Sequence, residues 1–371
     1  MLRDPAETSV QFPSKAWREG WRKLQHQHQP GAIPFTAADP LLDGLLPQLR
    51  VGSPALRNFR DVIWTRGQAG LFCASSGLLL EDTYPARFLR KRQCPYLASS
   101  KLELTCSAAE LPSLERAIYW PSLACGSLHA LITQVLPYAW PWIVPTASLD
   151  LSKRVVIGTA DRADDPWLGL ISSQVRREHG FFCLSEHLPI SLHLEDVLVP
   201  TPAYSVEAGF SDVYLRLLDT WLAQHRAADD LDITPGEDGD RRRLFLVLDV
   251  PRQEDDVLSG SLEQSFSELG WICRNLNRDG LGECLRALAL AEQVVTLDPV
   301  AAWLGRAATA HHFHQQFLIL GRQPAGLDLF QMIRRRQLCG HWLQLPDESC
   351  NASDKEAFFD QLMTDIGRFF V

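Results

Sequence analysis

The chain has 371 residues, with 36 lysines and arginines against 45 aspartates and glutamates, and therefore a formal net charge of −9. Apolar residues make up 46% and charged residues 22%, which is typical of a globular protein and excludes a disordered chain. The acidic balance argues against sequence-independent binding of nucleic acid, because that binding needs a basic surface. The length favours two domains.

The first residues, MLRDPAETSVQF, contain Asp4 and no apolar core, so we do not expect a secretory signal. The nine cysteines are odd in number and form no CxxC pair. This pattern is typical of reduced thiols in a cytoplasmic protein, not of a disulfide framework. We therefore expect a cytoplasmic location.

Residues 117–149 contain no Asp, Glu, Lys or Arg. The stretch is long enough to span a bilayer, but each of its four prolines removes a backbone donor, which hydrocarbon tolerates poorly. His129 and Gln134 add polar side chains to it. The stretch therefore predicts a buried core segment, and leaves peripheral contact with the inner face of a membrane open.

The first half begins with residues 1–50, which are polar and rich in proline and predict an extended arm. Short apolar runs between 58 and 80 predict a small antiparallel ribbon. Helical apolar spacing from residue 127 predicts a helix that ends at Pro137. A strand at 153–160 then starts an alternation of strands and helices, which indicates a parallel sheet covered by helices and extends to an amphipathic helix at 211–226.

The second half follows residues 226–241, whose six acids, one proline and two glycines predict a solvated linker. Strand and helix patterns alternate again from the apolar strand at 241–250 to an amphipathic helix at 354–370. The predicted fold class is α/β, with two Rossmann-like domains that face a cleft, at 51–225 and 242–371. The small β-ribbon lies near the N-terminus, and the terminal helix is placed to cross between the halves.

Candidate site residues should follow strands, because open α/β sheets bind ligands at the carboxyl ends of their strands. His129 lies near the start of a predicted helix, where an imidazole can act as a general base; a hydrogen-bonded core histidine is the alternative. Asp249 and Arg252 follow the central strand of the second half and suit a nucleotide ribose or phosphate, against the alternative of a loop salt bridge.

A further candidate is the turn after the strand that ends at Thr296. Asp298 is expected to cap the next helix, and Pro299 fits its first turn. Such a helix start suits a diphosphate, and a helix cap without a ligand is the alternative. The run HHFHQQ at 311–316 is a weaker candidate for a zinc site, because no acid or cysteine supports it nearby. The sequence has no GxGxxG, P-loop, GxSxG or HExxH motif.

The order of these pieces resembles glycosyltransferase family 61, bacterial enzymes of polysaccharide biosynthesis with a GT-B architecture. The family's early ribbon is similar to RNFRDVIWTRGQAGLFCASSGLLLED, and its NYyHWl-e-LPRl segment is similar to ACGSLHALITQVLPYAW. This likeness places His129 on the family histidine. A strand of the family that ends in Ser-Arg falls on LFLVLDVPR. A later run that ends in hGAaltN resembles LGWICRNLNRDGLGECLRALALAEQVVTLDPVAAWL, so the likeness covers roughly residues 50–320.

The sequence also departs from the family pattern. The Trp after the family histidine is Ala130 here, the Arg after Leu-Pro is Tyr138, and Asp298 replaces the histidine of hGAaltN. That last segment also resembles the vDT-paHLA turn of heptosyltransferase-like GT-B enzymes, with Trp303 in place of the histidine. Both resemblances imply a C-terminal half that binds a nucleotide sugar.

The resemblance implies an inverting glycosyltransferase that moves a sugar from a nucleotide-sugar donor to a hydroxyl of a glycan or other acceptor. His129 and Asp298 are then the expected catalytic residues, with His129 as general base. The nucleotide is expected to be held by Asp249, Arg252, Thr296 and Pro299. Helix N-termini and side chains compensate diphosphate charge in such sites, so we expect no metal and no other cofactor. The departures leave an alternative open, a catalytically inactive GT-B scaffold that binds a glycan or a protein.

Overall fold

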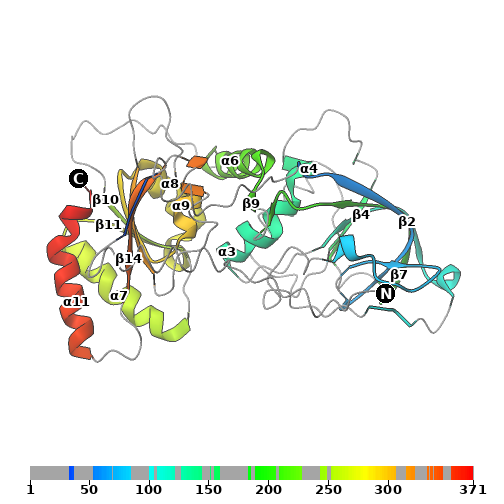
Figure 1. Cartoon of the computed structure of the whole chain (residues 1–371), viewed down its shortest axis with the longest axis horizontal. Helices are drawn as coiled ribbons and strands as arrows, with labels where there is room; N and C mark the ends of the chain where they lie inside the picture. The colour runs from blue at the N-terminus through cyan, green and yellow to red at the C-terminus, as the bar shows by residue number, and fades with distance from the viewer. Residues whose placement is uncertain are drawn as a thin grey trace. The chain divides into compact units, whose positions relative to one another are not determined.

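The computed structural model describes residues 33–36, 53–68, 70–84, 100–103, 107–121, 127–143, 151, 154–158, 183–184, 189–205, 209–227, 243–248, 252–305, 315–321, 332–333, 335–336, 338–345 and 352–370. The chain divides into two units (Figure 1). Unit 1 comprises Met1–Val10 and Arg50–Trp221, and unit 2 comprises Gln11–Leu49 and Leu222–Val371. The predicted linker overlaps the end of one helix at Arg226 and Ala227 and otherwise lies outside the described residues.

Unit 1 is built on a mixed sheet in the order β3-β2-β7-β4-β5-β6. Strands β7, β4, β5 and β6 run parallel, whereas β2 is antiparallel to both β7 and β3. The predicted ribbon is present as β2 and β3, but it belongs to the larger sheet because β2 pairs with β7 along its whole length. The bounds are β2 Leu56–Thr65, β3 Phe72–Cys73, β4 Ser113–Trp120, β5 Val155–Gly158, β6 Cys183–Leu184 and β7 Ser191–Pro200.

The uncharged stretch of unit 1 is buried, as predicted, but its helix does not end at Pro137. Four short helical elements of three kinds follow one another over residues 128–143, and every residue from Leu131 to Ile143 is buried. They are α3 Leu128–Ala130, the π-helix η5 Leu131–Val135, the 3₁₀ turn η6 Leu136–Tyr138 and α4 Trp140–Ile143. Among the described residues, no helix is both long enough and apolar enough to cross a membrane.

The remaining elements of this part of the chain are short, apart from one helix. The predicted amphipathic helix is confirmed as α6, Asp212–Ala227, and it buries one apolar face through Leu217, Leu218 and Trp221. Smaller elements are η1 Glu81–Thr83, η4 Ala108–Glu110 and the two-stranded sheet of β8 Tyr204–Ser205 and β9 Gly209–Phe210.

Unit 2 has a second sheet, in the order β1-β14-β13-β12-β10-β11. All of its strands are parallel except β1, which pairs with β14 in the antiparallel sense. Near-continuous apolar runs form the central strands, as expected for strands covered on both faces. The bounds are β1 Ile33–Thr36, β10 Arg243–Val247, β11 Ile272–Asn275, β12 Gln293–Thr296, β13 Gln316–Gly321 and β14 Cys339–Gln344.

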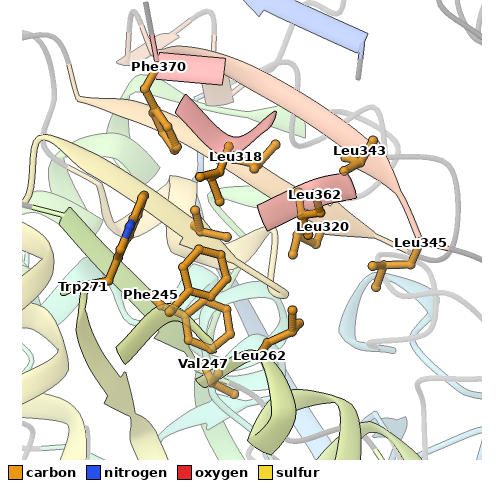
Figure 2. Close-up of a cluster of buried hydrophobic side chains, with 13 residues drawn as sticks. Phe245, Val247, Leu262, Trp271, Leu318, Leu320, Leu343, Leu345, Leu362 and Phe370 are labelled. Carbon is orange, nitrogen blue, oxygen red and sulfur yellow. The ribbon is translucent and has the colours of Figure 1, made fainter. Parts of the chain in front are cut away.

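Helices cover both faces of this sheet (Figure 1). One face packs against α7 and α11 through a core cluster, in which Figure 2 shows Phe245 of β10 and Leu318 of β13 together with Leu262 of α7 and Leu362 of α11. Leu244 and Leu246 alternate with Phe245 along β10, so they point to the opposite face, and they are equally buried. The helices are α7 Arg252–Glu268, α8 Leu276–Leu290, α9 Val300–Leu304, α11 Ala352–Asp365 and the terminal 3₁₀ helix η8 Ile366–Phe370. Both units are therefore α/β and compatible with a Rossmann-like fold.

Candidate functional site

The sheet of unit 2 has a topological switch point between β10 and β12. The chain passes from β10 to β11 on one side and then crosses to β12 on the other. The connections that leave two such strands diverge, and ligands of open α/β sheets bind in the crevice outside their carboxyl ends. Arg252 is the first residue of α7, which follows β10, and Asp298 follows β12. Asp249 and the side chain of Arg252 lie outside the described parts of the structure.

The predicted cap by Asp298 is confirmed. Its Oδ1 accepts a hydrogen bond from the backbone N–H of Val300 at 2.8 Å. The Thr296 hydroxyl accepts from the Asp298 N–H at 3.0 Å and donates to the Asp298 carbonyl at 3.3 Å. Both side chains are buried, and Pro299 supplies the residue immediately before α9. The turn is therefore held together by its own polar groups.

The hydrogen bonds of this turn also show how many backbone N–H groups at the start of α9 are left for a phosphate. In α9, Asp298 already accepts from the N–H groups of Val300 and Ala301, and Ala302 donates to Pro299. This helix has only five residues, whereas α7 has 17 and begins directly after β10. The first N–H groups of a helix have no partner within it. The N–H groups at the start of α9 are therefore already in use, and a diphosphate at α9 stays a prediction.

Unit 1 has a switch point of its own, between β4 and β7. Its parallel strands lie in the order β6-β5-β4-β7, so that β5 and β6 lie on one side of β4 and β7 on the other. The helical segment 127–143 follows β4 and carries His129 in its first turn. Ser127 caps that turn, with its Oγ accepting from the Ala130 N–H at 3.1 Å. The half-buried His129 thus lies near the start of a helix, as predicted.

The residues after β7 hold the same segment in place. The Ala203 N–H donates to the Pro137 carbonyl at 2.8 Å, and the Trp140 indole Nε1 donates to the Thr201 carbonyl at 2.9 Å. The segment that carries His129 is therefore tied to the carboxyl ends of both strands that border the switch point.

Tyr214 completes the hydrogen bonding of the π-helix. In an i→i+5 pattern the carbonyl of Ile132 would accept from the N–H of residue 137. Pro137 has no N–H. The Tyr214 hydroxyl donates to the Ile132 carbonyl instead, at 2.7 Å in a buried position. A side chain of α6 thus supplies the donor that the proline lacks.

Replacing Tyr214 by phenylalanine should destabilise the chain by about 1–3 kcal/mol, because the Ile132 carbonyl would be left buried without a donor. Urea unfolding measures the loss. A double-mutant cycle with Pro137→Ala, which restores an N–H at position 137, should reduce the cost of Tyr214→Phe. An equal cost in both backgrounds would contradict the assignment.

Cys73 is the last residue of β3 in unit 1 and lies beside two serines. Its Sγ lies 3.2 Å from the Ser75 Oγ, and hydrogen bonds from Ser75 and Ser76 lower the pKa of Cys73 to about 7. Burial acts in the opposite direction elsewhere, and raises the pKa of Cys273 to about 11 and of Cys284 to about 12. The Cys73 thiol therefore forms the thiolate most readily of these three.

Iodoacetamide at pH 7 should alkylate Cys73 about a hundredfold or more faster than Cys273 or Cys284, since the thiolate is the nucleophile. The Cys73 rate should rise with pH and reach half its maximum near pH 7. Peptide mass spectrometry gives the rate at each cysteine. The double variant Ser75→Ala, Ser76→Ala should move the midpoint upward, and an unmoved midpoint would contradict the role of the hydroxyls.

Three further residues belong to the helical segment of His129 or bond to it, and the sequence did not single them out as site residues: Thr133, Gln134 and Tyr214. The sequence marks them only weakly, because Thr133 and Gln134 are two polar residues within an otherwise apolar helix. The three histidines of the run, His311, His312 and His314, lie outside the described residues, so the zinc hypothesis stays a prediction. Within the parts that the structure describes, no group of three His, Cys, Asp or Glu side chains is arranged to hold a metal ion.

No protein-family model matches this sequence, and no curated protein matches it. A functional assignment therefore depends on the geometry of the two switch points.

Proposed function

We propose that this chain is a glycosyltransferase of the GT-B type, which transfers a sugar from a nucleotide-sugar donor to a hydroxyl of a glycan or other acceptor. One observation carries the proposal: each unit has a parallel α/β arrangement with a switch point, and residues singled out from the sequence follow the strands that border it. These residues are His129 in unit 1 and Arg252 and Asp298 in unit 2.

Unit 1 would bind the acceptor, with His129 as the general base. The imidazole would take the proton of the acceptor hydroxyl while its oxygen attacks the anomeric carbon of the donor. The bond between that carbon and the diphosphate oxygen breaks, and the nucleoside diphosphate leaves with the electron pair. Attack from the opposite face inverts the anomeric carbon.

Unit 2 would bind the donor at the start of α7. Backbone N–H groups at a helix N-terminus and the guanidinium of Arg252 suit a diphosphate and offset the charge that develops on it. The proposed chemistry needs no metal ion for this purpose. The proposal includes a cytoplasmic role in bacterial polysaccharide biosynthesis, and leaves peripheral contact with the inner face of the membrane open.

One feature favours the alternative, a catalytically inactive GT-B scaffold that binds a glycan or a protein. The first residues of α7 read RQEDD, so three acids follow Arg252 within one turn and a half. Acids stabilise a helix N-terminus but compete there with a phosphate. The two hypotheses differ in whether a nucleotide binds and whether transfer follows.

Thermal unfolding with UDP-, GDP-, ADP- and CMP-sugars at millimolar concentration tests the proposal. A donor present at a hundredfold excess over its Kd stabilises by about 2.7 kcal/mol, which should raise Tm by roughly 5 °C or more for a unit of this size. The variant Arg252→Ala should reduce the shift, whereas Arg368→Ala, an exposed cation on η8, should not.

Transfer itself is tested with His129→Ala. We expect it to lower kcat by about 10²–10⁴-fold while the nucleotide shift stays unchanged, because the histidine belongs to unit 1. If no nucleotide sugar raises Tm, the glycosyltransferase hypothesis is wrong. A nucleotide shift without transfer in the wild-type chain would favour the inactive scaffold.

A further inference from the structure

The π-helix gives the His129 segment one accessible face. Within residues 128–136, His129 and Ala130 are half-buried, and Thr133 and Gln134 keep 6% and 8% of their surface. The residues between them are fully buried, namely Leu128, Leu131, Ile132, Val135 and Leu136. Accessible positions thus recur four and five residues apart, the spacing of an i→i+5 helix. Every polar side chain of these nine residues lies on that face.

Gln134 differs from Thr133 in how its polar atoms are satisfied. The Thr133 hydroxyl donates to the His129 carbonyl at 2.7 Å. The Gln134 amide makes no hydrogen bond to any group that the structure describes, and the residue as a whole is more than nine-tenths buried. Neither polar atom of this amide is among the fully buried atoms that lack a partner, so the amide reaches the accessible face and is open to a ligand there.

Gln315 shows what a buried glutamine looks like when its role is structural. It is 4% exposed, and its Nε2 donates to the carbonyl of Leu288 at 2.6 Å and to that of Ala291 at 2.9 Å. The two glutamines have similar burial but opposite hydrogen bonding. Gln134 therefore does not serve the same purpose within the fold.

The chemistry of the accessible face limits the ligand that it suits. An amide and a neutral imidazole each offer a donor and an acceptor, which is what a hydroxyl requires. The sequence from 117 to 149 has no charged side chain of Asp, Glu, Lys or Arg to pair with a carboxylate or a phosphate. The groups that this segment supplies therefore suit a neutral, hydroxyl-bearing ligand.

We infer that Gln134 determines acceptor specificity: its amide binds a hydroxyl of a neutral sugar, next to the hydroxyl that His129 activates. The inference rests on the proposed function for the reaction at His129. It adds a residue and a substrate class, because it selects neutral glycans over uronic acids and other charged acceptors.

The first arm of the test compares the same substitution at the two buried glutamines. Gln134→Met should leave Tm within about 1 °C of the wild type, because no internal hydrogen bond is lost. Gln315→Met removes a donor from two carbonyls and should lower Tm by roughly 4 °C or more. An equal loss for Gln134→Met would show that its amide is structural, and would overturn the inference.

The second arm follows the Gln134 amide by NMR in protein labelled with ¹⁵N-glutamine. Its side-chain NH₂ signals are those missing from Gln134→Met. Lactose, maltose and cellobiose at up to about 50 mM should shift these signals, and Gln134→Met should weaken binding roughly tenfold, as expected for a lost hydrogen bond to a ligand. No shift with any of the three sugars, or equal binding by the variant, overturns the inference. Tighter binding of a uronic-acid disaccharide than of its neutral counterpart also overturns it.

The nucleotide-sugar melting experiment, run on the same two proteins, separates the inference from the function on which it rests. Nucleotide binding with no role for Gln134 refutes the inference alone. Sugar binding through Gln134 with no nucleotide binding refutes the glycosyltransferase and leaves a glycan-binding site.

Discussion

Replacing Gly340 by alanine should destabilise unit 2 by about 3 kcal/mol or more. A Cβ at this position would lie 1.9 Å from the carbonyl oxygen and 2.7 Å from the carbonyl carbon of Phe317. These are backbone atoms of β13, so no side chain can rotate away to make room. Gly340 also pairs with Phe35 of β1 on the other side, which prevents β14 from moving without a loss of pairing.

Urea unfolding followed by circular dichroism measures this loss. The matched control is Gly260→Ala in α7, where a Cβ meets nothing within 4 Å. Because alanine favours a helix over glycine, this control should stabilise the chain by up to about 1 kcal/mol. A Gly340→Ala protein as stable as the wild type would contradict the close approach of β13 and β14.

Replacing Arg154 by methionine should have the second largest effect, a loss of about 3 kcal/mol from unit 1. The Arg154 guanidinium pairs with Asp196 Oδ2 at 2.7 Å, and their side chains are only 14% and 26% exposed. It also donates to the carbonyls of Ala117 and Asp196, each at 3.4 Å. A residue just before β5 thus braces β4 and β7, and its loss leaves a mostly buried carboxylate.

Without Arg154, the Asp196 carboxylate would have few other groups to bind. Its Oδ1 is buried and has no hydrogen-bond partner in the part of the chain that the structure describes. The double variant Arg154→Met, Asp196→Leu should therefore be more stable than Arg154→Met alone, because it removes the unpaired charge. The exposed pair of Arg116 and Glu115, 3.7 Å apart, provides the control. Arg116→Met should change stability by less than about 1 kcal/mol, and a larger loss there than at Arg154 would contradict the argument.

The strands of unit 2 were predictable because several of them carry their own signals. The run from Leu244 to Leu248 is apolar throughout, and Gly270 ends the turn after α7 with a φ of 78°. Strand β14 was missed since a glycine in its interior argues against a strand. Gly340 is nevertheless required there, because the backbone of Phe317 comes too close for any side chain. That reason depends on another strand, so the local sequence does not contain it.

Strands β1 and β4 were missed for related reasons. The first half of β4, SLER, is polar and largely exposed, and only its second half, AIYW, is buried. Sequence alone assigned the second half to the uncharged stretch and gave no reason to begin a strand at Ser113. Strand β1 is a short edge strand within a polar region, and its pairing with β14 lies about three hundred residues away along the chain.

The parts of the candidate site that depend on neighbouring residues in the sequence were predictable. The parts that depend on contacts with distant residues were not. Asp298 follows the ordinary preference for a helix cap, and His129 follows a recognisable helix start. An α-helix would place Gln134 about 140° around the axis from His129. The π-helix brings both to the accessible face, and it depends on Pro137 and on Tyr214, 82 residues after Ile132. No local pattern in the sequence signals that combination.

Strand β1 also makes unit 2 a body of two separate chain segments, with unit 1 inserted between them. During synthesis, residues 33–36 leave the ribosome long before β14, so β1 cannot pair until the chain is almost complete. The main segment of unit 1, Arg50–Trp221, is complete before the C-terminal segment of unit 2 is made. A C-terminal half cut from the chain at residue 222 would expose the outer backbone groups of β14 as an open edge, which invites pairing with other chains. To produce unit 2 alone without this open edge, residues 11–49 should therefore be joined directly to the segment that begins at Leu222.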